Sequence, residues 1–344
     1  HSFPTRRSSD LYNEKVNFSL WCDFLERDFI DGEFNELIKN GTINGATSNP
    51  SIFKNAILNS PVYADAKDEF KKKEPKKLYE ILATQDIRSA AESLLKNFIN
   101  NDDGFVSIEV DPNLSNKAEA TFKEGKHLYG TIGMPNVMIK VPATKDGFLA
   151  MSELIRKGIS VNATLIFSPE QTKKCLEAFK EGIAGFKRYF PKANLPKAVI
   201  SIFVSRFDRL LDEKMAAANL PKAKIGIINA MKCYNIVKEA NLSFVKPLFA
   251  STGVKGDELP KDYYVSELLF ENSINTAPLD TIKAFIKSEN SPKTPLSNSQ
   301  IDEFFEKVKN AGIDMKKVYK KLLDDGLEQF VVAFDDIIKA LKKG

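Results

Sequence analysis

Short apolar runs alternate with longer amphipathic stretches along this chain from about residue 18 onward. A strand buried on both faces shows a short apolar run, whereas a helix covering a sheet repeats apolar residues three and four positions apart. The alternation therefore predicts βαβ units, in which helices connect and cover parallel strands. The predicted strands are residues 19–24, 45–48, 105–110, 137–141, 160–167, 198–204, 244–250 and 273–276.

Eight such runs in one chain favour an α/β fold of the (β/α)8 TIM-barrel type over an open sheet. Helical patterns lie between the runs, including 147–157 and 169–186, and Ser168 and Pro169 suit the N-cap and first position of the second helix. The gap between the second and third runs is long enough for two or three helices. Apolar residues at helical spacing in 299–343 predict additional C-terminal helices from about residue 300.

The first residues read differently from the rest of the chain. Residues 1–11 contain no starting Met and no apolar stretch of the kind found in a secretory signal. We therefore expect a non-native leader at 1–11. No repeat or low-complexity linker interrupts the remainder, so 12–344 is predicted to form a single barrel domain with its C-terminal helices.

Composition excludes several classes of partner. The 344 residues are 43% hydrophobic, and 50 Lys and Arg against 46 Asp and Glu leave a formal charge of +4 that is spread along the chain. Such a chain can bury a full core and is not expected to bind nucleic acid. No run reaches the roughly 20 apolar residues of a membrane span, so no membrane partner is expected. Cys22, Cys175 and Cys233 are too far apart for a metal knuckle, and we expect them to fill the core of a protein in the reducing cytoplasm.

Histidine is scarce, with only His1 and His127 in the sequence. A single internal imidazole supplies neither the ligands of a typical zinc site nor the partners of a Ser-His-Asp triad. We therefore expect His127 to be structural or on the surface, and we expect no metal site. Any chemistry has to run on carboxylates, amides, hydroxyls and lysines.

Lys140 is the first candidate for that chemistry. Strand alternation in 137–141 puts Lys140 with Met138 on the face opposite Val137, Ile139 and Val141, which points it into the barrel. Burial disfavours the charged ammonium form, and a free lysine amine can attack a carbonyl to form a Schiff base. On this strand alone, a lysine at a strand end that pairs with a carboxylate explains the pattern equally well.

Other predicted strands also place polar side chains inside the barrel. Asp23 and Glu109 project inward from the first and third runs, and in the fifth run Asn162, Thr164 and Ile166 share one face. Each polar position alone is more often a satisfied core group, but active sites of this architecture gather at the carboxyl ends of the strands. The convergent polar residues are Asp23, Asn49, Glu109, Asn162, Thr164 and Ser201.

The segments that carry these residues resemble the signature segments of the transaldolase family, in its longer bacterial branch. The resemblance extends from about Phe18 to beyond Ala277 and implies a class I Schiff-base enzyme on a (β/α)8 barrel. The implied reaction, in the pentose phosphate pathway, transfers a dihydroxyacetone unit from sedoheptulose 7-phosphate to glyceraldehyde 3-phosphate. Its products are erythrose 4-phosphate and fructose 6-phosphate, and it needs no metal or organic cofactor. The segments are 46–51 (ATSNPS), 106–111 (VSIEVD), 138–144 (MIKVPAT) and 161–168 (VNATLIFS).

Carried over to this sequence, the resemblance makes Lys140 the lysine that attacks the C2 carbonyl of the donor. Asp23 matches the general base that takes the proton of the C4 hydroxyl when the C3–C4 bond breaks. Glu109 matches the carboxylate that acts through a water held by Thr164. The pocket for the three-carbon enamine is formed in this resemblance by Asn49, Asn162 and Ser201.

The phosphate site implied by the resemblance has one departure from other branches of the family. Arg206, after the sixth run, matches the phosphate-binding arginine, and a guanidinium can grip phosphate oxygens bidentately. Ser251 and Lys255 follow the seventh run, where small residues can present backbone N–H groups to an anion. Lys255 replaces a second arginine, which keeps the charge and loses the planar fork.

Several alternatives remain open. Lys246 is a rival nucleophile, but it lies near the start of the run 244–250, the end that barrels use for stability. A fructose-6-phosphate aldolase that releases free dihydroxyacetone would use the same lysine chemistry. A barrel that only binds sugar phosphates is disfavoured, because unpaired ionisable groups in a core are costly. The sequence leaves open whether the protein is a monomer or a homodimer.

Overall fold

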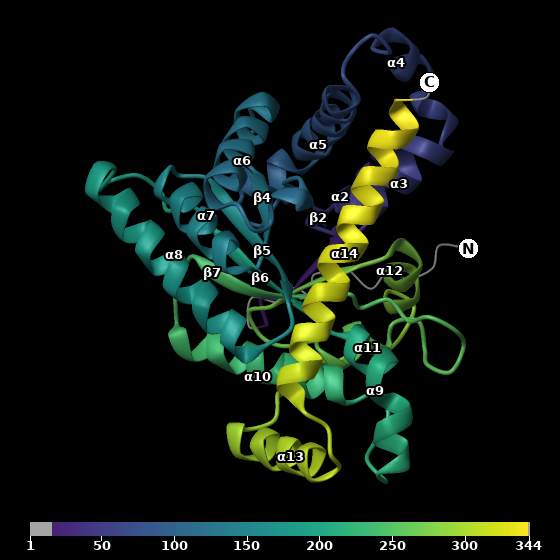
Figure 1. The fold of residues 1–344 in the computed structure, drawn as a ribbon, viewed down its shortest axis with the longest axis vertical. Helices are drawn as coiled ribbons and strands as arrows, with labels where there is room; N and C mark the ends of the chain where they lie inside the picture. The colour runs from purple at the N-terminus through teal and green to yellow at the C-terminus, as the bar shows by residue number, and fades with distance from the viewer. Residues whose placement is uncertain (1–15, 343–344) are drawn as a thin grey trace.

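Eight parallel strands form a closed barrel, in the order of the chain, in a computed structural model that describes residues 16–342 (Figure 1). Each predicted run overlaps one strand, which confirms the predicted (β/α)8 barrel. The predicted leader at 1–11 lies outside the described residues. The strands are β1 Ser19–Cys22, β2 Gly45–Thr47, β3 Phe105–Glu109, β4 Val137–Pro142, β5 Ser160–Ile166, β6 Ala198–Phe203, β7 Val245–Ala250 and β8 Ile274–Ala277.

Helices surround the barrel, and three α-helices fill the gap between β2 and β3 as the sequence predicted. A π-helical segment, Ile30–Phe34, and two 3-10 turns, Pro61–Tyr63 and Pro112–Leu114, complete the connections. The helices are α1 Arg27–Phe29, α2 Asn35–Lys39, α3 Pro50–Asn59, α4 Ala64–Glu69, α5 Pro75–Ile99, α6 Ala118–Ile132, α7 Lys145–Arg156, α8 Pro169–Tyr189, α9 Ser205–Ala217, α10 Ile225–Ala240, α11 Tyr263–Glu267, α12 Leu279–Phe285, α13 Asn298–Asn310 and α14 Met315–Leu341.

The N-terminus of α8 shows how local sequence fixes these elements. Ser168 accepts a hydrogen bond from the backbone of Gln171 at 3.0 Å, and the Gln171 side chain accepts one from the Ser168 backbone at 3.1 Å. This reciprocal capping box satisfies donors that the first helical turn leaves unpaired. Pro169 occupies the first turn, where its missing N–H costs nothing. The predicted start of this helix is confirmed.

The strands separate two apolar layers. Side chains such as Ile108 and Ile139 pack outward against the helices, whereas Trp21 and Met138 belong to a second cluster inside the barrel. At the amino end of the barrel, Asp103 closes this interior, because it accepts hydrogen bonds from Trp21 at 3.1 Å and from Lys246 at 2.9 Å. Lys246 therefore belongs to an ion pair at the end of the barrel that stabilises the fold.

The predicted alternation fails in the second half of β5. The pairing of β5 with β6 shifts register between Ala163 and Ile166, and Leu165 adopts a left-handed backbone with φ of 58°. Such a bulge turns Leu165 inward next to Thr164, and Ile166 joins the outer layer. The prediction that Ile166 faces inward was therefore wrong. A bulky residue in this conformation stores backbone strain beside the candidate site.

The predicted C-terminal helices are present as α13 and α14. Figure 1 shows α14 crossing in front of the barrel, from α13 and α10 at one end to α3 at the other. Side-chain contacts near both ends of α14 hold the helix in this position. Tyr319 donates to the Asn229 side chain at 2.9 Å on α10, and Asp336 forms an ion pair with Lys54 of α3 at 2.6 Å. Among the described residues, no helix combines the length and the hydrophobicity needed to cross a membrane.

Candidate active site

Three polar side chains from adjacent strands meet at the carboxyl end of the barrel. Residue Glu109 of β3 pairs in register with Lys140 of β4, and Lys140 pairs with Asn162 of β5. All three are buried, with exposed fractions of 6%, 5% and 0%. The pleat sends residues in the same register to the same face of the sheet, so the inward orientation predicted from alternation holds here.

The Lys140 amine has two polar neighbours. Its Nζ donates a hydrogen bond to the backbone carbonyl of Ser48 at 3.0 Å and lies 3.7 Å from Glu109 Oε2. Ser48 itself donates through its hydroxyl to the Ser107 carbonyl at 2.7 Å, which fixes the segment after β2 against β3. The nitrogen is thereby held between the Ser48 carbonyl and the Glu109 carboxylate, in a position from which it can attack the carbonyl carbon of a bound substrate.

Glu109 is a buried carboxyl group whose oxygens have no hydrogen-bond partner among the described residues. Burial raises its pKa from 4.5 to about 7, although the positive charge of Lys140 opposes the shift. The hydroxyl of Thr164 is also buried and unpaired. Buried polar groups without partners are costly, so these atoms form a natural place for a water or a substrate hydroxyl.

Asp23 directly follows β1 and is oriented by two threonines. Thr47 of β2 donates to Asp23 Oδ1 at 2.6 Å, and the hydroxyls of Thr47 and Thr276 lie 2.6 Å apart. Because the Thr47 proton is used on Asp23, Thr276 donates to Thr47. Burial raises the pKa of Asp23, and Lys140 and the Thr47 hydrogen bond oppose the rise. The sequence interpretation missed both threonines, although each lies inward in its strand pattern.

Asn162 is held by serines of two other strands, β6 and β3. Ser201 of β6 donates to Asn162 Oδ1 at 2.6 Å, and Asn162 Nδ2 donates to the Ser107 hydroxyl at 3.3 Å. Asn49 serves as the N-cap of α3, because its Oδ1 accepts from the Ile52 backbone at 3.0 Å. Because this bond uses Oδ1, the Nδ2 group of Asn49 remains as a donor for a ligand. The structure therefore brings the predicted amides to the same end of the barrel as Lys140.

The opposite side of the site carries a group of cations. Arg206 lies in the first turn of α9, its guanidinium is 5.1 Å from the Phe203 ring, and its buried Nη1 has no hydrogen-bond partner within residues 16–342. Burial and the nearby Arg209 lower the pKa of Arg206 to about 10, and Arg209, burial and Arg206 lower the pKa of Lys255. Positive groups that lower one another's pKa in this way create a positive potential that favours the binding of an anion.

Arg209 was not predicted, although it lies one helical turn after Arg206, a spacing that puts both on one side of α9. Ser251, which was predicted, follows β7 in a left-handed conformation with φ of 55°, and its hydroxyl lies 3.0 Å from that of Ser205. A non-glycine residue held in this region is a sign of local strain of the kind found at binding sites.

Helix α14 also contributes to the site, which the strand pattern could not predict. The Phe330 ring centroid is 5.9 Å from Lys140 Nζ. One turn earlier, a Cβ at Gly326 would lie 2.9 Å from Leu165 Cδ2 and 3.3 Å from Arg206 Nη1. The absence of a side chain at Gly326 lets the helix approach the barrel over these two residues.

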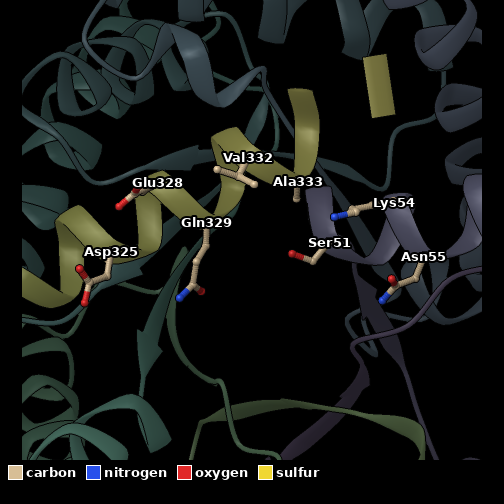
Figure 2. A pocket seen from close by; sticks show the side chains of 8 residues that line it. All are labelled: Ser51, Lys54, Asn55, Asp325, Glu328, Gln329, Val332 and Ala333. Carbon is tan, nitrogen blue, oxygen red and sulfur yellow. The ribbon is translucent and has the colours of Figure 1, made fainter. Parts of the chain in front are cut away.

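A polar groove of about 560 Å³ runs between α14 and the first turns of α3. Figure 2 shows residues of the two helices on opposite sides of it, with Gln329 on α14 and Ser51 and Asn55 on α3. Ser51 lies two residues after Asn49, so the groove opens beside the candidate site. The complete lining is Ser51, Lys54, Asn55, Asp325, Glu328, Gln329, Val332 and Ala333.

The remaining predicted candidates lie elsewhere. His127 is half-exposed and bonds to Glu80 on the surface at 2.6 Å, and Cys22, Cys175 and Cys233 are buried, free thiols. Residues 16–342 contain no group of three or more His, Cys, Asp or Glu placed to hold a metal ion. The polar side chains grouped with Lys140 are carboxylates, amides and hydroxyls.

Comparison with known proteins bears on this set of residues. The model of the transaldolase/fructose-6-phosphate aldolase family matches residues 20–341. The chain belongs to this family. A protein named transaldolase from Campylobacter jejuni strain RM1221 is 52% identical over 94% of this chain and 99% of its own length. A transaldolase from Helicobacter pylori strain P12 is 42% identical with the same coverage of both chains. The family resemblance inferred from the four sequence segments is thereby confirmed.

Proposed function

We propose that this protein is a transaldolase that works through a Schiff base on Lys140. The observation that carries the proposal is the buried Lys140 amine, held 3.7 Å from a carboxyl group whose pKa lies near 7. The two relatives named transaldolase support the same reaction. The donor is sedoheptulose 7-phosphate, the acceptor is glyceraldehyde 3-phosphate, and no cofactor takes part.

Lys140 attacks the C2 carbonyl of the donor and forms a carbinolamine. Loss of water from that adduct requires a proton on the leaving hydroxyl, and Glu109 supplies it through a water held by Thr164. A group with a pKa near the working pH can donate a proton in this step and accept one in the reverse step. The resulting iminium withdraws electrons from the adjacent carbon atoms.

Asp23 acts as the base in the next step. It takes the proton of the C4 hydroxyl, the C3–C4 bond breaks, and its electron pair moves into the iminium to form an enamine. Erythrose 4-phosphate leaves as the aldehyde. The hydrogen bond from Thr47 aims one carboxylate oxygen, and the pKa raised by burial makes Asp23 a stronger base.

The enamine then adds to the aldehyde of glyceraldehyde 3-phosphate, and hydrolysis of the new iminium releases fructose 6-phosphate and the free lysine. Asn49, Asn162 and Ser201 hold the hydroxyls of the bound three-carbon unit. The phosphate of either aldose is bound by Arg206, Ser251 and Lys255. Sugar phosphates reach the site through the groove between α3 and α14, which is large enough for them at about 560 Å³.

Trapping with borohydride tests the proposal. Reduction in the presence of labelled fructose 6-phosphate should leave one stable adduct on the peptide that contains Lys140. The matched pair of variants is Lys140→Ala and Lys246→Ala, since both remove a lysine from a barrel strand. An adduct that survives in Lys140→Ala and disappears in Lys246→Ala would overturn the assignment of the nucleophile.

Two other outcomes are informative. Rapid release of free dihydroxyacetone without an aldehyde acceptor would identify a fructose-6-phosphate aldolase, the second activity named by the family. Failure to form any reducible imine would indicate a barrel that only binds sugar phosphates. We further propose a cytoplasmic monomer or homodimer in the pentose phosphate pathway, in keeping with three unpaired, buried cysteines.

A further inference from the structure

We infer that Phe330 of α14 determines whether the enamine on Lys140 is transferred or lost to water. This inference rests on the proposed Schiff-base chemistry of Lys140 and adds a residue from outside the barrel to it. The Phe330 ring covers the nitrogen, keeps bulk water, other than the molecule held between Glu109 and Thr164, from the enamine, and thereby makes the protein a transferase rather than an aldolase that releases its three-carbon unit.

The two residues are neighbours, and both are buried. The Phe330 ring centroid lies 5.9 Å from Lys140 Nζ, and the two residues are only 4% and 5% exposed. On its other sides the nitrogen meets the Ser48 carbonyl and the Glu109 carboxyl group. Phe330 therefore adds an apolar surface to the immediate surroundings of this nitrogen.

The position of the ring is fixed from both sides of the barrel mouth. One turn before Phe330, Gly326 brings α14 down onto Leu165, so the helix cannot be displaced outward without opening this contact. Beyond Phe330, Asp336 of α14 forms an ion pair with Lys54 of α3 at 2.6 Å. These two contacts hold the part of α14 that carries Phe330 over the lysine.

The chemistry of the enamine explains why such a cover matters. If a proton reaches C3 of the enamine, the iminium of dihydroxyacetone forms. Water then adds to C2, the C2–N bond breaks, and free dihydroxyacetone and the lysine amine result. The first step needs a proton donor and the second consumes one water, so excluding water slows this loss and leaves the enamine to the aldehyde.

The ring has a second effect at this distance. A cation within about 6 Å of an aromatic face is attracted by the ring quadrupole. The iminium carries a positive charge on the lysine nitrogen, so the Phe330 ring stabilises it as well as shielding it. An aliphatic side chain would fill much of the same space without this attraction.

The test compares Phe330→Leu with Phe334→Leu. Both changes remove a phenyl ring from α14, and both residues are 4% exposed, but Phe334 packs on Tyr79 rather than on Lys140. For each variant, the rate of dihydroxyacetone release without acceptor is divided by the rate of transfer to glyceraldehyde 3-phosphate. We expect this ratio to rise about tenfold in Phe330→Leu, because water gains access to the enamine once the ring is removed, and to stay unchanged in Phe334→Leu.

The ratio separates shielding from structural damage, because a poorly folded enzyme loses both rates together. An unchanged ratio in Phe330→Leu, or an equal rise in Phe334→Leu, would overturn the inference. Borohydride trapping on the unaltered protein tests the Schiff base independently, so failure of the proposed function would be seen before either variant is made. Phe330→Met, which keeps an apolar chain of similar length, repeats the measurement if Phe330→Leu is unstable.

Discussion

Glu109 and Lys140 face each other in register on adjacent strands, and their charged groups lie 3.7 Å apart inside the barrel. The pair is not a simple salt bridge, because burial raises the pKa of Glu109 to about 7 against the pull of the lysine charge. Desolvation therefore outweighs attraction at this site. Near neutral pH Glu109 can therefore both donate and accept a proton, as the loss of water from a carbinolamine requires.

The raised pKa of Glu109 makes stability depend on pH. The folded protein binds this proton up to about pH 7, whereas an unfolded glutamate loses it near 4.5, so stability falls as the pH rises between these values. We expect Glu109→Gln to remove this loss. Measured by urea unfolding, the variant should gain about 1–3 kcal/mol relative to the unaltered protein between pH 5 and pH 8.

The control for this experiment is Glu303→Gln, because Glu303 on α13 is 69% exposed. It should leave the pH dependence of stability as it is. A Glu109→Gln variant with the same pH dependence as the unaltered protein would show that Glu109 ionises at its ordinary pKa.

The hydrogen bond from Thr47 to Asp23 should set the activity at low pH. Thr47→Val removes a bond of 2.6 Å that favours the ionised carboxylate, so the pKa of Asp23 rises further. We expect kcat to fall by about 10- to 100-fold, with the acid limb of the pH profile moved to higher pH. Thr121→Val is the matched control, since Thr121 is also buried and bonded but lies in α6. An acid limb that stays in place would contradict the role of Thr47.

Arg209 should contribute to the binding of phosphate. It is exposed, yet its charge lowers the pKa of both Arg206 and Lys255. Since it adds charge at the rim, Arg209→Gln should raise the KM for fructose 6-phosphate by about three- to tenfold with little change in kcat, and added salt should diminish the effect. Inorganic phosphate should inhibit the variant less than the unaltered protein.

The exposed Arg188 at the end of α8 supplies the control for Arg209. Arg188→Gln removes the same charge far from the site and should leave KM unchanged. Equal effects of the two substitutions would mean that only the net charge of the protein matters.

Gly326→Ala tests how closely α14 must approach the barrel. The added Cβ would lie 2.9 Å from Leu165 and 3.3 Å from the Arg206 guanidinium, so both side chains have to move. We expect a loss of about 1–3 kcal/mol of stability and a higher KM for sugar phosphates, although alanine favours a helix. Gly130→Ala in α6, where nothing lies within 4 Å of the added Cβ, should be neutral or stabilising. Similar behaviour of the two variants would contradict the close approach.

Much of this arrangement follows from a simple periodicity. The two-residue repeat of a strand sends Glu109 and Lys140 inward, and parallel strands bring their carboxyl ends together, so the sequence alone predicted their meeting. The same repeat predicted the wrong orientation for Ile166. The bulge at Leu165 inserts an extra residue, and a two-residue pattern in the sequence does not reveal such an insertion.

The residues contributed by other elements were harder to foresee. The helical pattern of α14 shows that Gly326 and Phe330 share a face, four residues apart, but not that this face covers Lys140. Arg209 was missed for a related reason, since its proximity to Lys255 depends on how α9 leaves the barrel. Contacts of this kind are set by tertiary packing rather than by local sequence.

Helix α14 follows all eight barrel strands in the sequence, and this order has a consequence for the synthesis of the protein. Asp23 follows the first strand and Lys140 lies in the fourth, and the barrel is complete once β8 has been synthesised. Phe330 follows only at the end of the chain, in α14. During translation Lys140, Glu109 and Asp23 are therefore made before Phe330. A protein cut short after β8 would keep the residues proposed to break the carbon bond and lose the one proposed to protect the product of that break.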